Sequence, residues 1–246
     1  MTGDGTASSS RTGEVFRLIR RDILSGALAG GERLRSTMLR ARYGAGLTPV
    51  REALARLAGS GLVTGQEQHG FRVVPTSEED LRDITRVSVL TESDAIVRAV
   101  ERADGATDAA LLRAFEALAG TPMRSEADTG GGVHDAWSEA HRRFHESLIA
   151  PCGSSWLLQL NALLFDHAER YRQLAFRVAP DRDLVDEHRR LLDAVLGRDP
   201  ARAAALVDAH WSATAEAVLA SGALRSGGDG STPPLRKGAF GSGAPS

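Results

Sequence analysis

The chain has a single cysteine, Cys152, and no long apolar run. One cysteine excludes a disulfide within the chain and every zinc motif built on paired cysteines. No segment approaches the roughly 20 apolar residues of a membrane span, and residues 1–10 lack the basic and apolar parts of a signal peptide. We therefore expect a cytoplasmic protein with no membrane partner.

Lysine is absent from residues 11–75, yet this segment is the basic part of the chain. It holds eleven arginines against five acidic residues, whereas the rest of the 246-residue chain holds 19 basic and 27 acidic residues. A basic module on an acidic body suits a polyanion that binds the first part only. An uneven solvated surface is the alternative interpretation of the charges alone.

Large apolar residues are almost missing from both ends. Residues 1–10 and 222–246 are rich in Gly, Ser, Pro and Thr, so we expect both to be disordered. Between them the pattern changes from strand-like alternation to long helical periodicity near residues 75–77. The sequence thus predicts two domains, over residues 11–75 and 76–221.

The first domain shows the order helix, helix, helix, hairpin. Apolar spacing and glycine breaks predict helices over residues 12–24 and 37–43, a third helix from the N-cap Thr48 to the glycines at 59–61, and strands over 62–64 and 71–74. This order is typical of a winged helix-turn-helix, whose third helix enters the major groove of DNA. Arg51 lies in the first turn of that helix, opposite its apolar face, where a guanidinium can bind guanine or phosphate. Further phosphate contacts are expected from Arg35, Arg40, Arg42 and Arg56.

A resemblance to a known family follows from the segment ILSGALAGGERLRSTMLRARYGAGLTPVREALARLAGSGLVTGQEQHGFRVV. It is similar to the DNA-binding module of the GntR family of bacterial regulators. The resemblance implies that Arg35, Thr48 and Arg51 contact the major groove and that His69 and Gly70, at the wing tip, approach the minor groove. The family usually has Ser-Arg before the Thr-Pro pair, but Gly46 and Leu47 stand here, so one arginine contact is missing.

The second domain shows only helical patterns. They cover residues 78–103, 106–119, 133–150, 154–178, 181–197 and 200–220, with short breaks between them. Such a series predicts an antiparallel bundle of about six helices. The fold class expected for the whole chain is therefore mainly α.

Four histidines fall on the apolar stripes of three of these helices, namely His141, His145, His188 and His210. A lone histidine on such a stripe is usually a core residue that bonds a carbonyl. Burying four imidazoles without partners is costly, and a divalent metal satisfies all of them through their ring nitrogens. The pattern therefore favours a metal site inside the bundle.

The bundle resembles the FCD ligand-binding domain of FadR-type GntR regulators, through HRRFHESL, EHRRLLDAVLGRDPARAA and DAHW. The resemblance implies a metal held by three histidines and an Asp or Asn, and the latter position is His141 here. A neutral imidazole in place of a carboxylate suits zinc first, with nickel or copper as alternatives, better than magnesium or manganese. His141 swinging away to leave a three-histidine site is a second hypothesis. Ser88 also departs from the family, replacing an arginine four residues before Glu92.

An effector site is expected beside this metal. His167 shares an apolar stripe and is a candidate for lining the cavity, although packing is the simpler role. Arg170 and Arg172 flank the same helix and are candidates for an effector carboxylate, with solvated surface positions as the alternative.

These features predict a homodimeric transcription regulator that binds a two-fold DNA operator and senses a small organic acid. Two other functions stay open: a constitutive DNA binder with a purely structural metal, and a metal-dependent hydrolase. The hydrolase is disfavoured because HRRFH lacks the glutamate that acts as base in HExxH enzymes.

Overall fold

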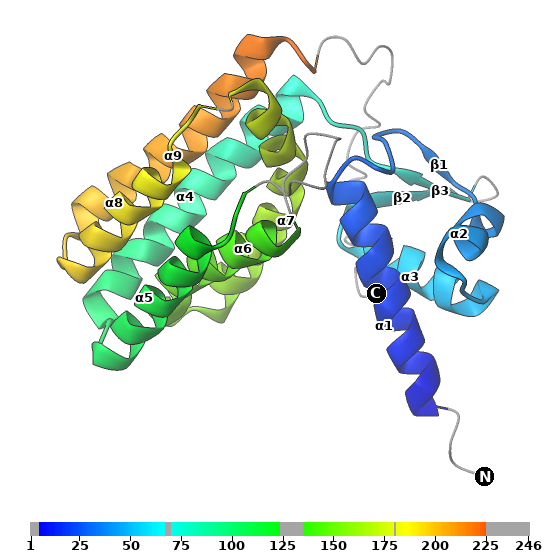
Figure 1. Cartoon of the computed structure of the whole chain (residues 1–246), viewed down its shortest axis with the longest axis horizontal. Helices are drawn as coiled ribbons and strands as arrows, with labels where there is room; N and C mark the ends of the chain where they lie inside the picture. The colour runs from blue at the N-terminus through cyan, green and yellow to red at the C-terminus, as the bar shows by residue number, and fades with distance from the viewer. Residues whose placement is uncertain (1–4, 67–69, 124–134, 180, 225–246) are drawn as a thin grey trace, which may run out of the picture.

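The structure, a computed structural model, describes residues 5–66, 70–123, 135–179 and 181–224. It contains an N-terminal body with a small sheet beside a larger bundle made only of helices (Figure 1). The mainly α architecture expected from the sequence, with a winged module followed by a helical bundle, is confirmed.

The N-terminal body begins with α1 (Gly5–Leu24), β1 (Arg33–Leu34) and α2 (Ser36–Tyr43), and continues with α3 (Leu47–Gly59), β2 (Val63–Gln66) and β3 (Gly70–Val73). The strands form an antiparallel sheet in the order β1-β3-β2. The expected hairpin is present, and the two-residue strand β1, which the sequence pattern did not indicate, pairs with β3.

The three N-terminal helices enclose one apolar core. Its fully buried side chains are Val15, Ile19 and Ile23 of α1, Leu39 of α2, and Val50, Leu54 and Leu57 of α3. Gly44 ends α2 in the left-handed conformation, with φ at 57°, which a residue without a Cβ adopts at no steric cost. The core therefore fixes α1 against α3 and leaves the opposite face of α3 exposed.

Two helix starts differ from the sequence prediction. Helix α1 begins at Gly5 instead of residue 12, so it includes residues 5–10. An existing helix extends upstream at little cost through residues such as Ala and Ser, because nucleation is the expensive step. Helix α3 begins at Leu47 with Gly46 as its N-cap, so Thr48 lies inside the first turn. Pro49 is tolerated there because the first N–H groups of a helix have no intrahelical acceptor.

The bundle consists of α4 (Glu78–Arg102), α5 (Gly105–Gly120), α6 (Asp135–Ile149), α7 (Ser155–Val178), α8 (Leu184–Leu196) and α9 (Pro200–Ser221), with a short 3-10 turn over Ala150–Cys152. Side chains cap several of them: Ser77 accepts the N–H of Asp80, and Asp104 forms a reciprocal capping box with Thr107. Within the described residues, none of the helices combines the length and apolar character needed to span a membrane.

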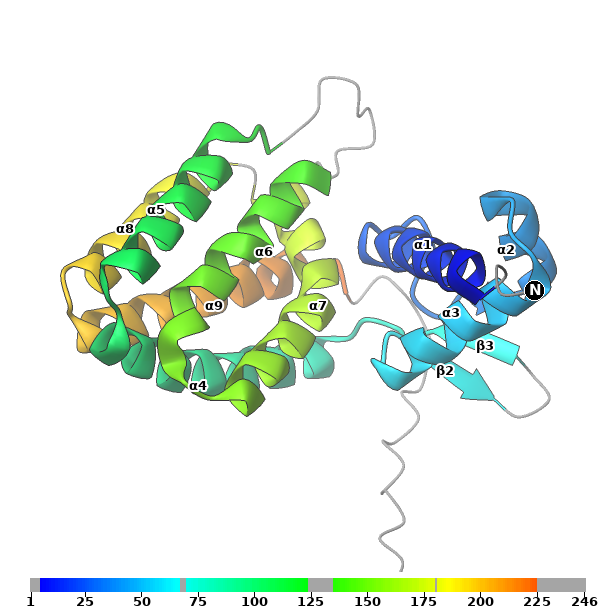
Figure 2. The same ribbon diagram turned by 90° about the horizontal axis from the view of Figure 1, so that it is seen from below.

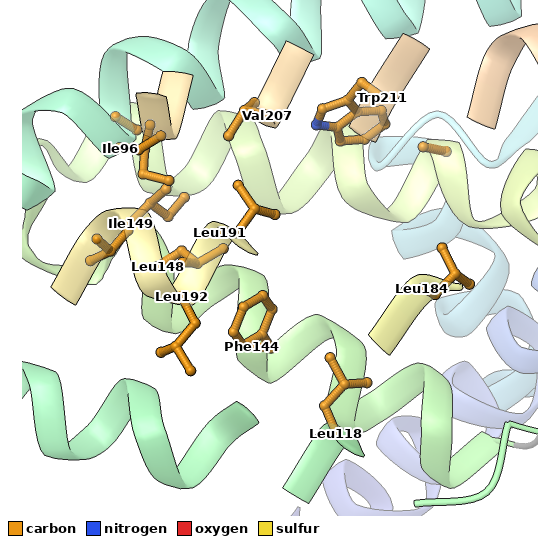
Figure 3. Packing of buried hydrophobic residues seen from close by; sticks show 14 of the residues in the cluster. Ile96, Leu118, Phe144, Leu148, Ile149, Leu184, Leu191, Leu192, Val207 and Trp211 are labelled. Carbon is orange, nitrogen blue, oxygen red and sulfur yellow. The ribbon is translucent and has the colours of Figure 1, made fainter. Parts of the chain in front are cut away.

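All six helices of the bundle contribute buried side chains to one core. Figure 3 shows Phe144 and Leu148 of α6 beside Leu191 and Leu192 of α8, with Leu184 at the start of α8; Val207 and Trp211 of α9 belong to the same cluster of buried residues. The same inward faces carry the four histidines of interest. Figure 2 shows α7 on the side of the bundle that faces the N-terminal body.

Candidate metal centre and nucleic-acid interface

Four histidines from three helices meet in the bundle core. His141 and His145 lie one turn apart on α6, His188 lies on α8 and His210 on α9. One ring nitrogen from each lies within 4.8 Å of the others, and all four side chains are buried. The convergence expected from the apolar stripes is therefore present.

Three of these rings have a fixed orientation. Nδ1 of His145 lies 2.8 Å from Oε1 of Glu92, Nδ1 of His210 lies 2.8 Å from Oε2 of Glu187, and Nδ1 of His188 lies 2.5 Å from the carbonyl of Leu184. A carboxylate or a carbonyl only accepts, so each Nδ1 carries the proton and donates it. Each Nε2 is then left with a lone pair directed at the cluster, which is the tautomer that a metal ligand needs.

His141 is arranged differently from the other three. Its Nε2 lies 2.9 Å from Nε2 of His188, its ring stacks on Trp137 at 4.7 Å, and its buried Nδ1 has no hydrogen-bond partner among the described residues. Among the described residues, the hydrogen bond between Nε2 of His141 and Nε2 of His188 is therefore the one that involves a ring nitrogen of His141.

The nitrogen separations suit a metal ion. Nε2 of His145 and Nε2 of His188 lie 3.3 Å apart. Because both carry lone pairs, the contact is repulsive unless a cation or a proton lies between them. Nitrogens around a tetrahedral zinc, with Zn–N bonds of 2.0–2.1 Å, are about 3.3 Å apart. The donor set thus fits a divalent transition metal, with Glu92, Glu187 and the Leu184 carbonyl orienting the ligands; the His145–His188 pair has the tetrahedral spacing, and the four ligand atoms lie within 4.8 Å of one another.

Burial keeps the imidazoles of His141, His188 and His210 neutral. It lowers the pKa of His141 and of His188 well below the usual value, and it also lowers the pKa of His210. Burial alone would raise the pKa of Glu92, but the charge and hydrogen bond of His145 and the hydrogen bond from Trp211 together lower it. The interior therefore combines neutral imidazoles with an ionised carboxylate, as a cation site requires.

A small cavity lies beside the cluster. Its volume is about 10 Å³, close to the space for one water molecule. Its lining includes His141, His210 and two arginines, Arg172 of α7 and Arg182 of the segment before α8. The expected effector candidate Arg172 is thus at the cavity, where its guanidinium donates to Glu169 and to the Phe165 carbonyl.

Arg182 escaped the sequence reasoning because it lies off the apolar stripe of the helix expected over residues 181–197; in the structure it precedes α8, which begins at Leu184. It forms a two-pronged ion pair with Glu187, and its NH1 donates to Oγ1 of Thr214 at 2.8 Å. Ser88, which stands where the family has an arginine, is fully buried with no partner for its hydroxyl among the described residues. Within the described part of the chain, Arg172 and Arg182 are therefore the cations that line the cavity.

The other two effector candidates lie elsewhere. Nε2 of His167 donates to the carbonyl of Ser60, 2.7 Å away in the N-terminal body, and NH1 of Arg170 donates to the carbonyl of Val74. Neither residue lines the cavity. They follow the stripe on α7 that faces the N-terminal body, because residues three and four apart share one helix face. The structure therefore does not place them beside the cavity, and their contacts join the two domains.

The expected DNA contacts form an exposed surface on the N-terminal body. Arg35, Thr48 and Arg51 are exposed. A surface hollow is lined by Arg33, Arg35 and Arg51 together with Leu47, Gly70 and Phe71. Arg33 is an additional cation there, found only because β1 pairs with β3. Arg56 instead lies over the ring of Phe16 at 4.2 Å, and His69 is outside the described residues.

Comparison with protein families gives two matches that together span most of the chain. Residues 11–73 match the bacterial regulatory proteins of the gntR family, and residues 83–213 match the FCD domain.

Individual relatives agree with these matches. The chain is 35% identical over 214 residues to an uncharacterized HTH-type transcriptional regulator, BphR, of Paraburkholderia xenovorans, which covers 86% of each protein. It is 36% identical over 200 residues to the HTH-type transcriptional repressor GlaR of Escherichia coli, covering 79% of this chain and 90% of that one.

Solved structures share the fold. Escherichia coli McbR/YncC superimposes with a TM-score of 0.68 at 21% identity, covering 86% of this chain and 98% of the other. A putative GntR regulator from Rhodococcus sp. RHA1 gives a TM-score of 0.67 at 18% identity, covering 86% and 99%. The relatives are described as transcription regulators and not as enzymes.

Proposed function

Because the chain belongs to the GntR family of bacterial regulatory proteins with an FCD domain, and is a DNA-binding transcription regulator, we propose that its bundle binds zinc and a small carboxylate that modulates operator binding. The observation that carries this proposal is the meeting of four buried imidazoles, three of which have Nδ1 committed to an acceptor. Nickel is the alternative metal, because both ions accept imidazole nitrogen readily.

The charges around the cavity support an anionic effector. Arg172 is paired with Glu169 and Arg182 with Glu187, so each pair is close to neutral. Glu92 adds one negative charge and a divalent ion would add two positive ones. The buried site would then carry an excess of positive charge, which a carboxylate on the metal or on an arginine compensates.

Entry of an effector requires local movement, since the cavity holds about one water molecule. Arg182 is the residue that we expect to move. It precedes α8, and its guanidinium is held by the side chains of Glu187 and Thr214 and by the carbonyl of His210. We propose that an effector carboxylate replaces Glu187 as its partner. Such a step converts effector binding into a movement of the connection between α7 and α8.

A homodimer is part of the same proposal. Trp156, Leu160 and Leu163 share one face of α7 and are exposed, Trp156 by 79%. Leu90 of α4 is 65% exposed, and Thr91 next to it contacts Asn161 of α7, which places the two helices side by side. Exposed apolar side chains on two neighbouring helices mark a candidate interface, and a second copy of the chain would also provide the two DNA-binding heads of a two-fold operator.

Zinc binding is tested on chelator-treated protein by calorimetric titration. The wild type should bind one zinc per chain. His188→Ala should weaken binding by at least about 100-fold, because loss of an outer-shell partner alone typically costs 10–100-fold. His167→Gln is the matched control outside the cluster and should bind as the wild type does. Equal zinc affinity of all three proteins would refute the metal site.

DNA binding is tested by fluorescence anisotropy on the intergenic DNA upstream of the chain's own gene. Arg51→Ala should remove sequence-specific binding and lower the salt slope by about 1, whereas Arg98→Ala, an exposed arginine of α4, should leave both unchanged. The effector is sought by adding small mono- and dicarboxylates to the zinc-loaded protein. Arg182→Gln should abolish the response and keep zinc binding, with Arg190→Gln on the exposed side of α8 as its control.

One observation favours a second function, in which the metal is purely structural. Four nitrogen ligands complete a tetrahedral zinc site and leave no position for an effector, as in closed structural sites. Under this reading zinc removal lowers stability, but no carboxylate alters DNA affinity. His141→Ala opens one coordination position, so a carboxylate response confined to that variant would favour the structural reading.

A further inference from the structure

One carboxylate on α7 is shared by arginines from both domains. Oδ2 of Asp166 accepts a hydrogen bond of 3.1 Å from Nε of Arg20 on α1, and its Oδ1 accepts from NH2 of Arg20 and from NH2 of Arg142 on α6. Each of the three side chains is at most 25% exposed. These ion pairs are therefore less screened than ordinary surface pairs and depend more strongly on geometry.

Arg142 connects this carboxylate to the histidine cluster. It follows His141 directly in α6, and its guanidinium lies 4.9 Å from the ring centre of Phe165. That ring lies 5.4 Å from the ring of His141 and 5.5 Å from the ring of His145. Packed side chains thus form an unbroken series of contacts from the cluster to Asp166.

Arg20 connects the same carboxylate to the DNA-binding helix. It lies on α1, whose apolar face packs on α3 in the N-terminal core. A hydrogen bond of 2.7 Å from Thr12 to Glu52 and the stacking of Arg56 on Phe16 hold the two helices together along their length. A displacement of α1 is therefore transmitted to α3, which carries Arg51.

The two arginines share one oxygen of the carboxylate, so a movement of one arginine changes the hydrogen bond of the other. Arg20 and Arg142 both donate to Oδ1 of Asp166, and NH1 of Arg142 also lies 3.8 Å from Oε1 of Glu146. A shift of Arg142 toward Asp166 weakens the hold on Arg20, and a shift away strengthens it. Coupling between distant sites requires an element whose arrangement both sites bias, and the shared oxygen of Asp166 is where the contacts from the two domains meet.

We propose that Asp166 is a positioning residue that transmits the occupancy of the histidine cluster to α1 and α3 by dividing its carboxylate between Arg142 and Arg20. The inference rests on the proposed metal site. A metal ion draws the four imidazoles together, which moves His141 and its neighbour Arg142 on the same turn of α6. The N-terminal body then changes its orientation or its local stability without contacting the metal.

Hydrogen exchange of the full-length protein, with zinc and with chelator, tests this proposal without a known operator. In the wild type, zinc should change the exchange rates of α1 and α3 amides by about 5-fold or more, the lower end of typical allosteric coupling. Asp166→Asn should bind zinc as the wild type does but lose this change in α1 and α3, while the bundle amides still respond. Asp94→Asn, in the exposed pair with Arg98 on α4, is the matched control and should keep it.

The possible results distinguish failure of the proposed metal site from failure of the proposed role of Asp166. Absence of zinc binding to the wild type refutes the proposed metal function and the inference with it. Zinc binding without any change in α1 and α3, or an unaltered change in Asp166→Asn, overturns the inference alone. Should Asp166→Asn fail to fold, Arg20→Gln removes the same bridge from the other side, and full transmission in that variant contradicts the proposal equally.

Discussion

His141 sets the charge of the candidate metal centre. The other three imidazoles have an acceptor behind them, whereas His141 has only Trp137 stacked against it and an unpartnered Nδ1 among the described residues. A neutral fourth ligand leaves the first coordination shell without charge. In the proposed metal site this side chain would decide which class of metal is preferred, because carboxylate ligands suit manganese and magnesium better than imidazoles do.

Exchange of that ligand should change metal selectivity. His141→Asp adds one negative charge next to the cation, so we expect manganese affinity relative to zinc to rise by about tenfold. Competition titrations on chelator-treated protein measure the ratio. His141→Asn supplies an oxygen donor without the charge, and it should give a smaller change. An identical ratio in the wild type and in His141→Asp would show that His141 is not a ligand.

Gly61 makes a close approach between the domains. Its φ is +74°, and a Cβ there would lie 3.1 Å from Cε1 of His167. Gly61→Ala should therefore lower the free energy of unfolding by about 1–2 kcal/mol, because alanine is strained in the left-handed conformation. The clash with His167 should lower it further. Urea unfolding measures the loss. Gly26→Ala is the matched control, because Gly26 has φ of +79° with nothing within 4 Å. An equal decrease in the free energy of unfolding of both variants would show that the contact with His167 does not contribute.

Among the elements, α7 contacts the histidine cluster with one face and the N-terminal body with another. Phe165 and Arg172, two turns apart, face the cluster and the cavity, whereas Asp166, His167 and Arg170 face the N-terminal body. Tyr171 adds hydrogen bonds to Ser77 and Asp80 at the start of α4. The helix that borders the candidate ligand site is thus also the helix that holds the DNA-binding module.

The α7 contacts should depend on pH through His167. Burial lowers its pKa, with a smaller opposing effect from its hydrogen bond to Ser60. Because the folded-state pKa lies below the unfolded value of about 6.5, the unfolded chain binds the proton more readily, and stability falls as the pH drops through and below 6.5. Urea unfolding at pH 7.5 and 5.5 in chelator should show a smaller loss for His167→Gln than for the wild type. An equal loss in both would assign the pH dependence to other groups.

At the scale of the whole molecule, the apolar face of α4 and α7 should hold two chains together. Introducing charge there, as in Trp156→Glu combined with Leu160→Glu, should convert a dimer into a monomer, because burying two uncompensated carboxylates is costly. Light scattering after gel filtration should give twice the chain mass of 26.1 kDa for the wild type and one chain mass for the variant. Leu112→Glu is the control, because Leu112 is an exposed leucine on a different helix, α5. This variant should stay dimeric. A monomeric wild type contradicts the proposal.

Local signals in the sequence were sufficient for most of the fold. Apolar periodicity located the six bundle helices within about three residues, because each stripe must face a core regardless of its partners. Glycine at the end of α2 and the hairpin residues predicted the winged module for similar local reasons. The starts of α1 and α3 were missed because helix ends depend on small energy differences between neighbouring residues.

The candidate site was predictable in part for the same reason. A stripe specifies that His141, His145, His188 and His210 point inward, and convergence follows once the helices pack. Arg182 and Arg33 had no such signal, since one lies in a connection and the other on a two-residue strand. The contacts of His167 and Arg170 with the N-terminal body had no such signal either, because a helical stripe identifies a buried face but not the domain that buries it.

The order of apolar and polar residues by itself determined the helices, their inward faces and the basic DNA-binding module, because these depend on spacing along one chain. The tertiary structure alone decided which ring nitrogen each histidine turns to the cluster, which arginines border the cavity, and that Asp166 joins Arg20 to Arg142. These facts concern residues far apart in sequence. Hydrogen-bond geometry and burial exist only after the helices have packed, so no spacing rule could supply them.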